Sequence, residues 1–157
     1  MKRSTATILQ TAIVTAGIAI FIFLLWEPTV EGRNAHATLF ETYFNDPLLA
    51  CAYLAAIALF VALYQLFKLL GDAGQTGALT HHALHRLRTI RWCALIIIAF
   101  VLIGEAYLFF VVRGTDDIAG GVGMGIVVAL ASAITAAAIA MSERRLLLHS
   151  NRERPEG

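Results

Sequence analysis

Long apolar stretches separated by short polar segments dominate the pattern of this chain. Four of them carry almost no charged residue, and they cover 4–26, 47–67, 92–112 and 118–142. At about 1.5 Å per helical residue, each is long enough to cross a hydrocarbon core about 30 Å thick. We therefore predict an all-α, polytopic membrane protein with four transmembrane helices in an up-down bundle.

Residues at the ends of these stretches set the predicted boundaries of a single membrane domain, 1–157. Asp46 and Pro47 supply an N-cap and a first-turn proline for the second helix, and Gly71 suits its C-terminal end. The third helix is predicted to begin before the membrane, because the segment from Thr80 onward contains no helix breaker. The predicted helices are about 4–26, 47–70, 80–112 and 118–148.

The first loop, 27–46, is predicted to contain a short amphipathic helix. A structureless segment of this length is uncommon in a compact domain. Within 35–44, apolar side chains recur at helical spacing, which favours a helix lying against the outer surface of the bundle or of the bilayer. These apolar residues are Leu39, Phe40, Tyr43 and Phe44.

Basic residues mark one side of the predicted membrane. Ten of the twelve lie in the N-terminus, in the loop between the second and third helices with its junctions, or in the C-terminal tail. The other two loops contain only Arg33 and Arg113. Because cytoplasmic segments carry an excess of Lys and Arg, both termini are predicted to be cytoplasmic.

Composition supports lipid as the solvent for much of the chain. Hydrophobic residues make up 59% of it and the mean hydropathy is +0.73, so a water-soluble fold of this length could not enclose its apolar surface. The lipid bilayer is therefore the first predicted partner. Cys51 and Cys93 are predicted near opposite faces of the bilayer, which excludes a disulfide between them and favours buried thiols.

One ionisable residue, Glu105, lies well inside a predicted span. A carboxylate at that depth is costly unless it is paired, hydrated or protonated. Its candidate partners are Tyr53 and the loop residues Arg33 and His36. Two interpretations stay open: a proton or cation site that opens to the outside, or a structural contact that fastens the outer loop to the helices.

The fourth predicted helix is rich in small residues. Gly121, Gly125, Ala129 and Ala133 follow one another at intervals of four. Small residues at this spacing let helix backbones approach closely in lipid. The tightest helix packing is therefore predicted here, either within the chain or between subunits.

Histidines and arginines gather before the third span. His81 and His85 share one helical face at a spacing that can chelate zinc, but the glutamate of the metalloprotease motif is missing and the neighbours are cationic. We therefore predict no metal site. The segment is instead predicted to form a juxtamembrane basic surface that attracts anionic lipid headgroups. This surface comprises His81, His85, Arg86, Arg88 and Arg91.

Several strings of the chain resemble those of a family of small bacterial four-helix membrane proteins, the domain of unknown function DUF2975. They are EGRNAHATLFE at 31–41, VALYQLFKLL at 61–70, LRTIR at 87–91 and DDIAGG at 116–121. The resemblance implies four spans and a multi-pass protein of the bacterial cytoplasmic (inner) membrane. It also implies a regulatory partner, since such proteins are often encoded beside a helix-turn-helix regulator. It implies no catalytic or binding residue.

Function is predicted to be non-enzymatic. No Ser/His/Asp, Cys/His or paired-carboxylate arrangement occurs in the membrane or in a loop large enough to build a pocket. The prediction is a sensory, regulatory or partner-binding membrane module without a cofactor and without direct nucleic-acid contact. The alternatives are a small oligomeric transporter coupled to protons or cations through Glu105, and a membrane immunity or tolerance protein. Homo-oligomerisation stays open.

Overall fold

The computed structural model describes residues 3–30, 47–76, 81–112 and 119–152, which form four long helices. They are α1 (Arg3–Val30), α3 (Pro47–Thr76), α4 (His81–Tyr107) and α5 (Ala119–Arg152), and α4 continues into a π-helical segment, η2 (Leu108–Val112). All four helices are long and apolar enough to span a membrane, which confirms the prediction of an all-α chain with four candidate spans. The predicted outer-loop helix lies outside the described residues.

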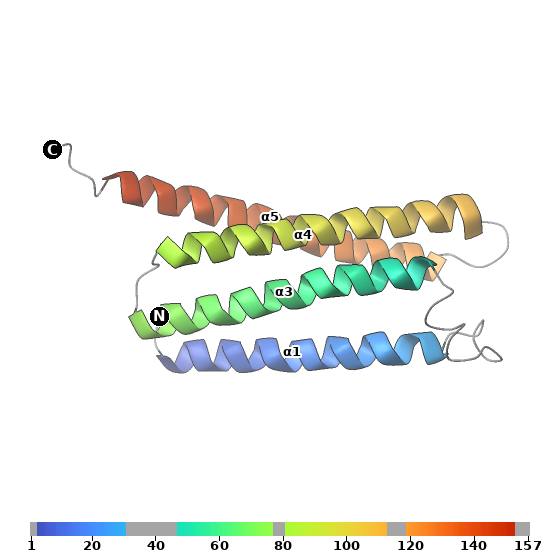
Figure 1. Ribbon diagram of the computed structural model, residues 1–157, viewed down its shortest axis with the longest axis horizontal. Helices are drawn as coiled ribbons and strands as arrows, with labels where there is room; N and C mark the ends of the chain where they lie inside the picture. The colour runs from blue at the N-terminus through green and yellow to red at the C-terminus, as the bar shows by residue number, and fades with distance from the viewer. Residues whose placement is uncertain (1–2, 31–46, 77–80, 113–118, 153–157) are drawn as a thin grey trace.

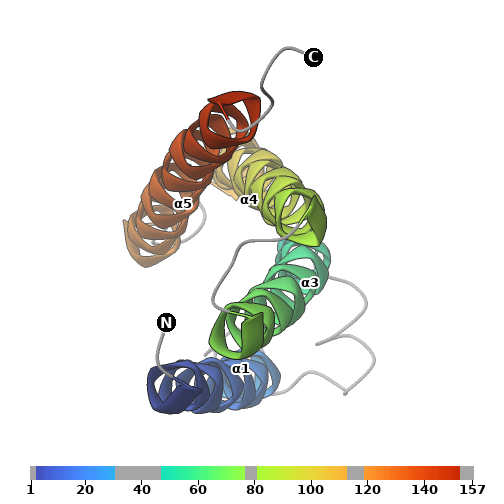
Figure 2. The ribbon, with the colours of Figure 1, turned by 90° about the vertical axis from the view of Figure 1, so that its left-hand side faces the viewer.

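Successive helices run in opposite directions, so α1 begins and α5 ends at the same end of the molecule (Figure 1). Each helix packs on the next one along the chain. Seen end-on, the helices form an arc with α1 and α5 at its two ends (Figure 2). Extensive contact between α1 and α5 is absent from the described part of the chain.

The four helices keep the up-down order of the prediction, but they stand in an open row, an arrangement that the prediction did not specify. In water, exposed apolar faces would drive α1 and α5 together. In a bilayer, lipid tails cover those faces equally well, so helices associate only where their surfaces fit. The surface of the row agrees with this, since the most apolar windows of α1 and α5 contain no buried residue.

Close backbone packing joins α1 to α3. The Gln10 side-chain amide donates a hydrogen bond to the Phe67 carbonyl, 3.0 Å away. A Cβ atom at Gly71 would lie 2.9 Å from Gln10 Nε2, and one at Gly74 would lie 2.6 Å from the Cβ of Ala6. The sequence-based prediction that Gly71 ends the second helix is wrong, because α3 continues to Thr76. The glycine makes room for α1 instead.

The core lies where α3, α4 and α5 meet. Ala58, Cys93 and Ile97 form a buried cluster. Partly buried apolar side chains surround it, namely Leu59, Ala62, Val101 and Val128. Cys51 is half-buried and Cys93 is buried, and both are free thiols, as predicted. Elsewhere large apolar side chains point outward, and Phe110 in η2 is 85% exposed. Lipid is the solvent that such a surface requires.

Candidate functional site

Glu105 packs directly on the backbone of α5. It lies near the end of α4 and is half-buried. Its carboxylate occupies the space beside Gly125 where any larger residue would place its Cβ atom. Gly125 therefore provides the notch that lets α5 approach α4 at the level of this acid.

Two further glycines bring the helices close around this point. A Cβ atom at Gly104 would lie 3.2 Å from Leu48 Cδ1 on α3, and one at Gly121 would lie 3.0 Å from Leu108 Cδ1 in η2. Both distances are shorter than ordinary carbon–carbon contacts of about 3.5–4.0 Å. Glu105 is thus held between helices that approach closely on either side of α4.

The predicted partners of Glu105 do not account for its placement. Arg33 and His36 lie outside the described residues, and Tyr53 is half-buried on α3. The described residues offer Glu105 neither a hydrogen bond nor an ion pair. Its contact with Gly125 is one of packing. The structure therefore adds an unforeseen neighbour to this acid and leaves its pairing with the outer loop as a prediction.

Only some of the small residues of α5 lie on the face that contacts α4. Gly125 and Ala129 are half-buried, whereas Gly121 and Ala133 are exposed. Beyond Ala129, the face toward α4 continues through half-buried residues at helical spacing. These are Ser132, Ala136 and Ala140. A strict interval of four drifts around a helix of 3.6 residues per turn, which explains why the alanine column leaves the interface.

A second acid, which the sequence analysis did not single out, links α4 to α5. Arg91 Nη1 donates a hydrogen bond to Glu143 Oε2 at 3.1 Å. The Glu143 side chain is only 12% exposed, while that of Arg91 is 40% exposed. The other carboxylate oxygen, Oε1, is buried and receives no hydrogen bond from the described residues. Among the described residues, Arg91 therefore compensates the buried negative charge of Glu143.

The signal for this pair was present in the helical periodicity. Glu143 directly follows the fourth apolar stretch, which ends at residue 142, and lies within the predicted helix 118–148. It also lies seven residues after Ala136, on the same face of α5. A charged residue that continues an apolar face near a span end is a candidate for an interhelical ion pair.

In the structure, some residues of the predicted juxtamembrane basic surface form ion pairs with neighbouring helices, whereas others are exposed. Arg91 is engaged with Glu143, and Arg86 forms an ion pair with Asp72 of α3 at 3.3 Å. His85 and Arg88 are exposed, and their role in a lipid-binding surface stays a prediction. The side chain of His81 is outside the described part of the structure. Among the described residues there is no group of three or more His, Cys, Asp or Glu that could hold a metal ion.

These features define a multi-pass α-helical membrane protein in which several polar side chains join its own helices. The chain belongs to the family described as protein of unknown function (DUF2975), whose model matches residues 4–147. It is also 30% identical, over 149 residues, to the uncharacterised membrane protein YoaS of Bacillus subtilis strain 168; the match covers 93% of this chain and 91% of that protein. No solved structure matches. The family resemblance seen in the sequence is confirmed, and neither description names an activity.

Proposed function

We propose that this chain is a non-enzymatic membrane module with a sensory or regulatory role, and that it acts by binding a transmembrane helix of a partner protein along α1. The observation that carries this proposal is the open row of helices. Among the described helices, α1 packs extensively only on α3, so these helices leave most of its circumference uncovered.

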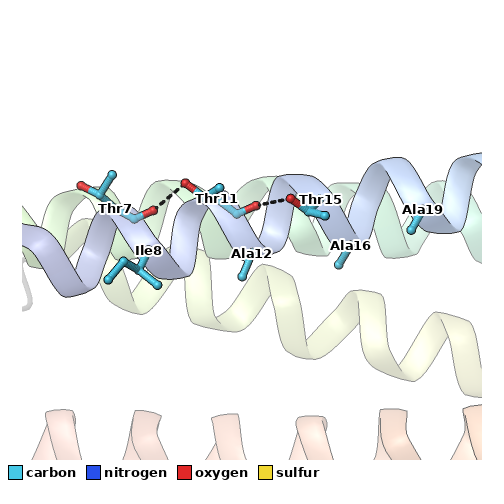
Figure 3. Close-up of a pocket in the computed structure, with 7 residues that line it drawn as sticks. All are labelled: Thr7, Ile8, Thr11, Ala12, Thr15, Ala16 and Ala19. Carbon is cyan, nitrogen blue, oxygen red and sulfur yellow. Dashed lines mark hydrogen bonds between the residues drawn. The ribbon is translucent and has the colours of Figure 1, made fainter.

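The first half of α1 has a shallow depression along its free face (Figure 3). Its lining comes from one helix and consists of Thr7, Ile8, Thr11, Ala12, Thr15, Ala16 and Ala19. The face turned toward α3 lies on the other side of the helix, where Ala6, Gln10 and Gly17 meet that neighbour. Small side chains therefore occupy two opposite faces of α1, and one of these faces is unoccupied by the described residues.

The hydroxyl groups of all three threonines on this face already donate hydrogen bonds within α1. Thr7 Oγ1 donates to the carbonyl of Arg3 at 3.1 Å. Thr11 and Thr15 donate to the carbonyls of Thr7 and Thr11, both at 3.0 Å. Each side chain thus folds back on its own helix, which gives a smooth, low surface that another helix can approach closely.

A helix is a better occupant of this face than lipid alone. Small residues of α1 also take part in its contact with α3, where Ala6 meets Gly74 and Gly17 faces Leu63 and Phe60. Large apolar side chains are exposed in both halves of α1. Ile8, Leu9 and Val14 are exposed in the first half, and Ile8 also lines the depression. The second half exposes more of them, namely Ile18, Phe21, Ile22, Phe23, Leu25 and Trp26. Apart from Ile8, the depression is lined by threonine and alanine, which supports a helix contact on this face.

Site-specific photocrosslinking in intact membranes tests this proposal. A photoreactive residue at Ala12 is expected to give an adduct of one defined size with another membrane protein, whereas one at Phe23 gives none. Adding Ala16→Phe fills the depression and is expected to abolish the Ala12 adduct, while Ile22→Phe leaves it intact. An adduct between two copies of this chain, or Ala12 adducts that persist with Ala16→Phe, would overturn the proposal.

We further propose that both termini face the cytoplasm of a bacterial cell and that the chain lies in its cytoplasmic membrane. Single cysteines at Asp117 and at Gly157, in a protein whose Cys51 and Cys93 are replaced by alanine, report the two sides. A membrane-impermeant maleimide is expected to label position 117 in intact cells and position 157 only after permeabilisation. The reverse labelling pattern contradicts the proposed orientation.

A further inference from the structure

Positive charge is in excess where α4 begins and α5 ends. Two described carboxylates near this end are engaged by arginines, Glu143 by Arg91 and Asp72 by Arg86. Three more arginines are exposed and form no ion pair with a described residue; they are Arg88, Arg144 and Arg145. We call these three residues the arginine surface. Among the described residues, the two interhelical pairs engage both acids near this end and leave the arginine surface without an ion pair.

The Arg91–Glu143 pair fixes how α4 and α5 bring this surface together. Arg88 precedes Arg91 by three residues, and Arg144 directly follows Glu143. Since the pair places these two points of α4 and α5 at one level, Arg88 and Arg144 lie within about one helical turn of the same contact. Both are also near the ends of candidate membrane spans, Ala83–Val111 and Ala119–Leu148.

Large apolar side chains adjoin these cations. Trp92, one turn from Arg88 toward the middle of the span, is 58% exposed. Met141, one turn from Arg144 toward the middle of its span, is 59% exposed. Tryptophan at a span end favours the headgroup region, and arginine there can direct its guanidinium to lipid phosphate. The surface therefore combines cations with apolar contacts at the depth of a lipid headgroup.

We propose that the arginine surface binds the phosphate of an anionic phospholipid of the surrounding bilayer. Arg88 and Arg144 contact the headgroup, while Trp92 and Met141 lie beside its acyl chains. A soluble phosphate would contact only the arginines, whereas a phospholipid would also contact the apolar side chains beside them. The presence of both kinds of residue therefore favours a lipid. Each positive charge near a membrane surface contributes about a fivefold gain in affinity for an anionic headgroup.

Lipid titration of the purified, full-length protein in mild detergent tests this assignment. Retained lipid is counted by native mass spectrometry, with phosphatidylglycerol and phosphatidylcholine of identical acyl chains as probes. Arg88→Gln combined with Arg144→Gln is expected to weaken phosphatidylglycerol binding by roughly 25-fold, at about fivefold per charge, and to leave phosphatidylcholine binding unchanged. All substituted side chains are exposed, so the helical content is expected to stay the same.

The matched control removes two exposed cations from α1 and α3. Arg3→Gln with Lys68→Gln lowers the net charge equally, and Lys68 Nζ lies 5.7 Å from the centroid of the exposed Tyr64 ring. This variant is expected to keep phosphatidylglycerol binding within about twofold of the wild type, because neither residue belongs to α4 or α5, which carry the proposed headgroup contacts. An equal loss in both variants would overturn the site. Displacement of the lipid by an equimolar soluble glycerol phosphate would overturn the choice of ligand.

Discussion

Replacing Gly125 by alanine is expected to lower the free energy of unfolding by about 1–3 kcal/mol, the range for adding a methyl group to a packed site. The new Cβ atom would occupy the position of the Glu105 carboxylate, so either α5 must move away or the acid must leave its place. Denaturation of the purified protein in mixed micelles, with helical circular dichroism as the signal, gives the difference directly.

Gly123 offers a control two residues away on the same helix. A Cβ atom there meets nothing within 4 Å, and the residue is exposed. Gly123→Ala should therefore be neutral or stabilise by up to about 1 kcal/mol through helix propensity. If Gly125→Ala behaves like Gly123→Ala, then the contact between Glu105 and α5 does not constrain the fold.

A double-mutant cycle separates the steric effect of the new methyl group at position 125 from the effect of removing the Glu105 carboxylate. Glu105→Ala removes the atoms that collide with the new methyl group, so Gly125→Ala should cost much less in that background than in the wild type. Glu105→Gln keeps the shape of the side chain and removes its charge. If packing on Gly125 is the main role of Glu105, this isosteric variant keeps the wild-type stability to within about 0.5 kcal/mol.

The same cycle bears on the transport alternative. A carboxylate that carries protons or cations must reach water, and Glu105→Gln would then abolish flux in reconstituted vesicles while leaving stability unchanged. The packing contact with Gly125 gives Glu105 a structural role that needs no such pathway. Unchanged flux with Glu105→Gln, together with a destabilised Gly125→Ala, would remove the case for transport through this residue.

Features of the fold that depend on residues close together in the chain could be predicted from the sequence. The four spans follow from local apolar composition, because an apolar segment in a bilayer must satisfy its backbone hydrogen bonds internally and therefore forms a helix. The family resemblance followed from strings such as the one at 87–91, and it held over residues 4–147. Both depend on residues near one another in the chain.

Contacts between helices were less predictable, because they depend on matching surfaces from distant segments. Gly71 suits a helix end by local rules, yet the proximity of Gln10 on α1 explains why a glycine stands inside α3. The open row likewise depends on which faces fit, and hydropathy carries no information about this. Glu105 was identified as unusual from its depth alone, but its neighbour Gly125 was assigned only to general helix packing.

Charged residues at span ends were the most difficult to assign. The predicted basic surface combined two arginines that lie in interhelical pairs, Arg86 and Arg91, with exposed Arg88. All three belong to one stretch of about two helical turns, and composition cannot distinguish them. Their angular positions on α4 decide which neighbour each can reach, since Arg86 meets α3 and Arg91 meets α5.

Removing Arg91 is expected to destabilise the fold more than removing its partner. Arg91→Met leaves the Glu143 carboxylate, 12% exposed, without its cation, and breaking a buried ion pair in this way costs about 3 kcal/mol. Glu143→Met instead leaves a guanidinium that is 40% exposed and can turn toward water or headgroups. Its expected cost is about 1 kcal/mol or less, in the range of exposed pairs.

The double replacement completes this test. Arg91→Met with Glu143→Met substitutes apolar contact for charge at the α4–α5 interface, and its stability is expected to lie near the wild type, above that of Arg91→Met alone. Arg86→Met serves as the control, because its pair with Asp72 is more exposed at 23% and 43%, and its loss should cost no more than about 1 kcal/mol. Unfolding in mixed micelles ranks the four variants. A larger cost for Glu143→Met than for Arg91→Met would mean that the carboxylate, with its buried Oε1, contributes more than the cation that compensates it.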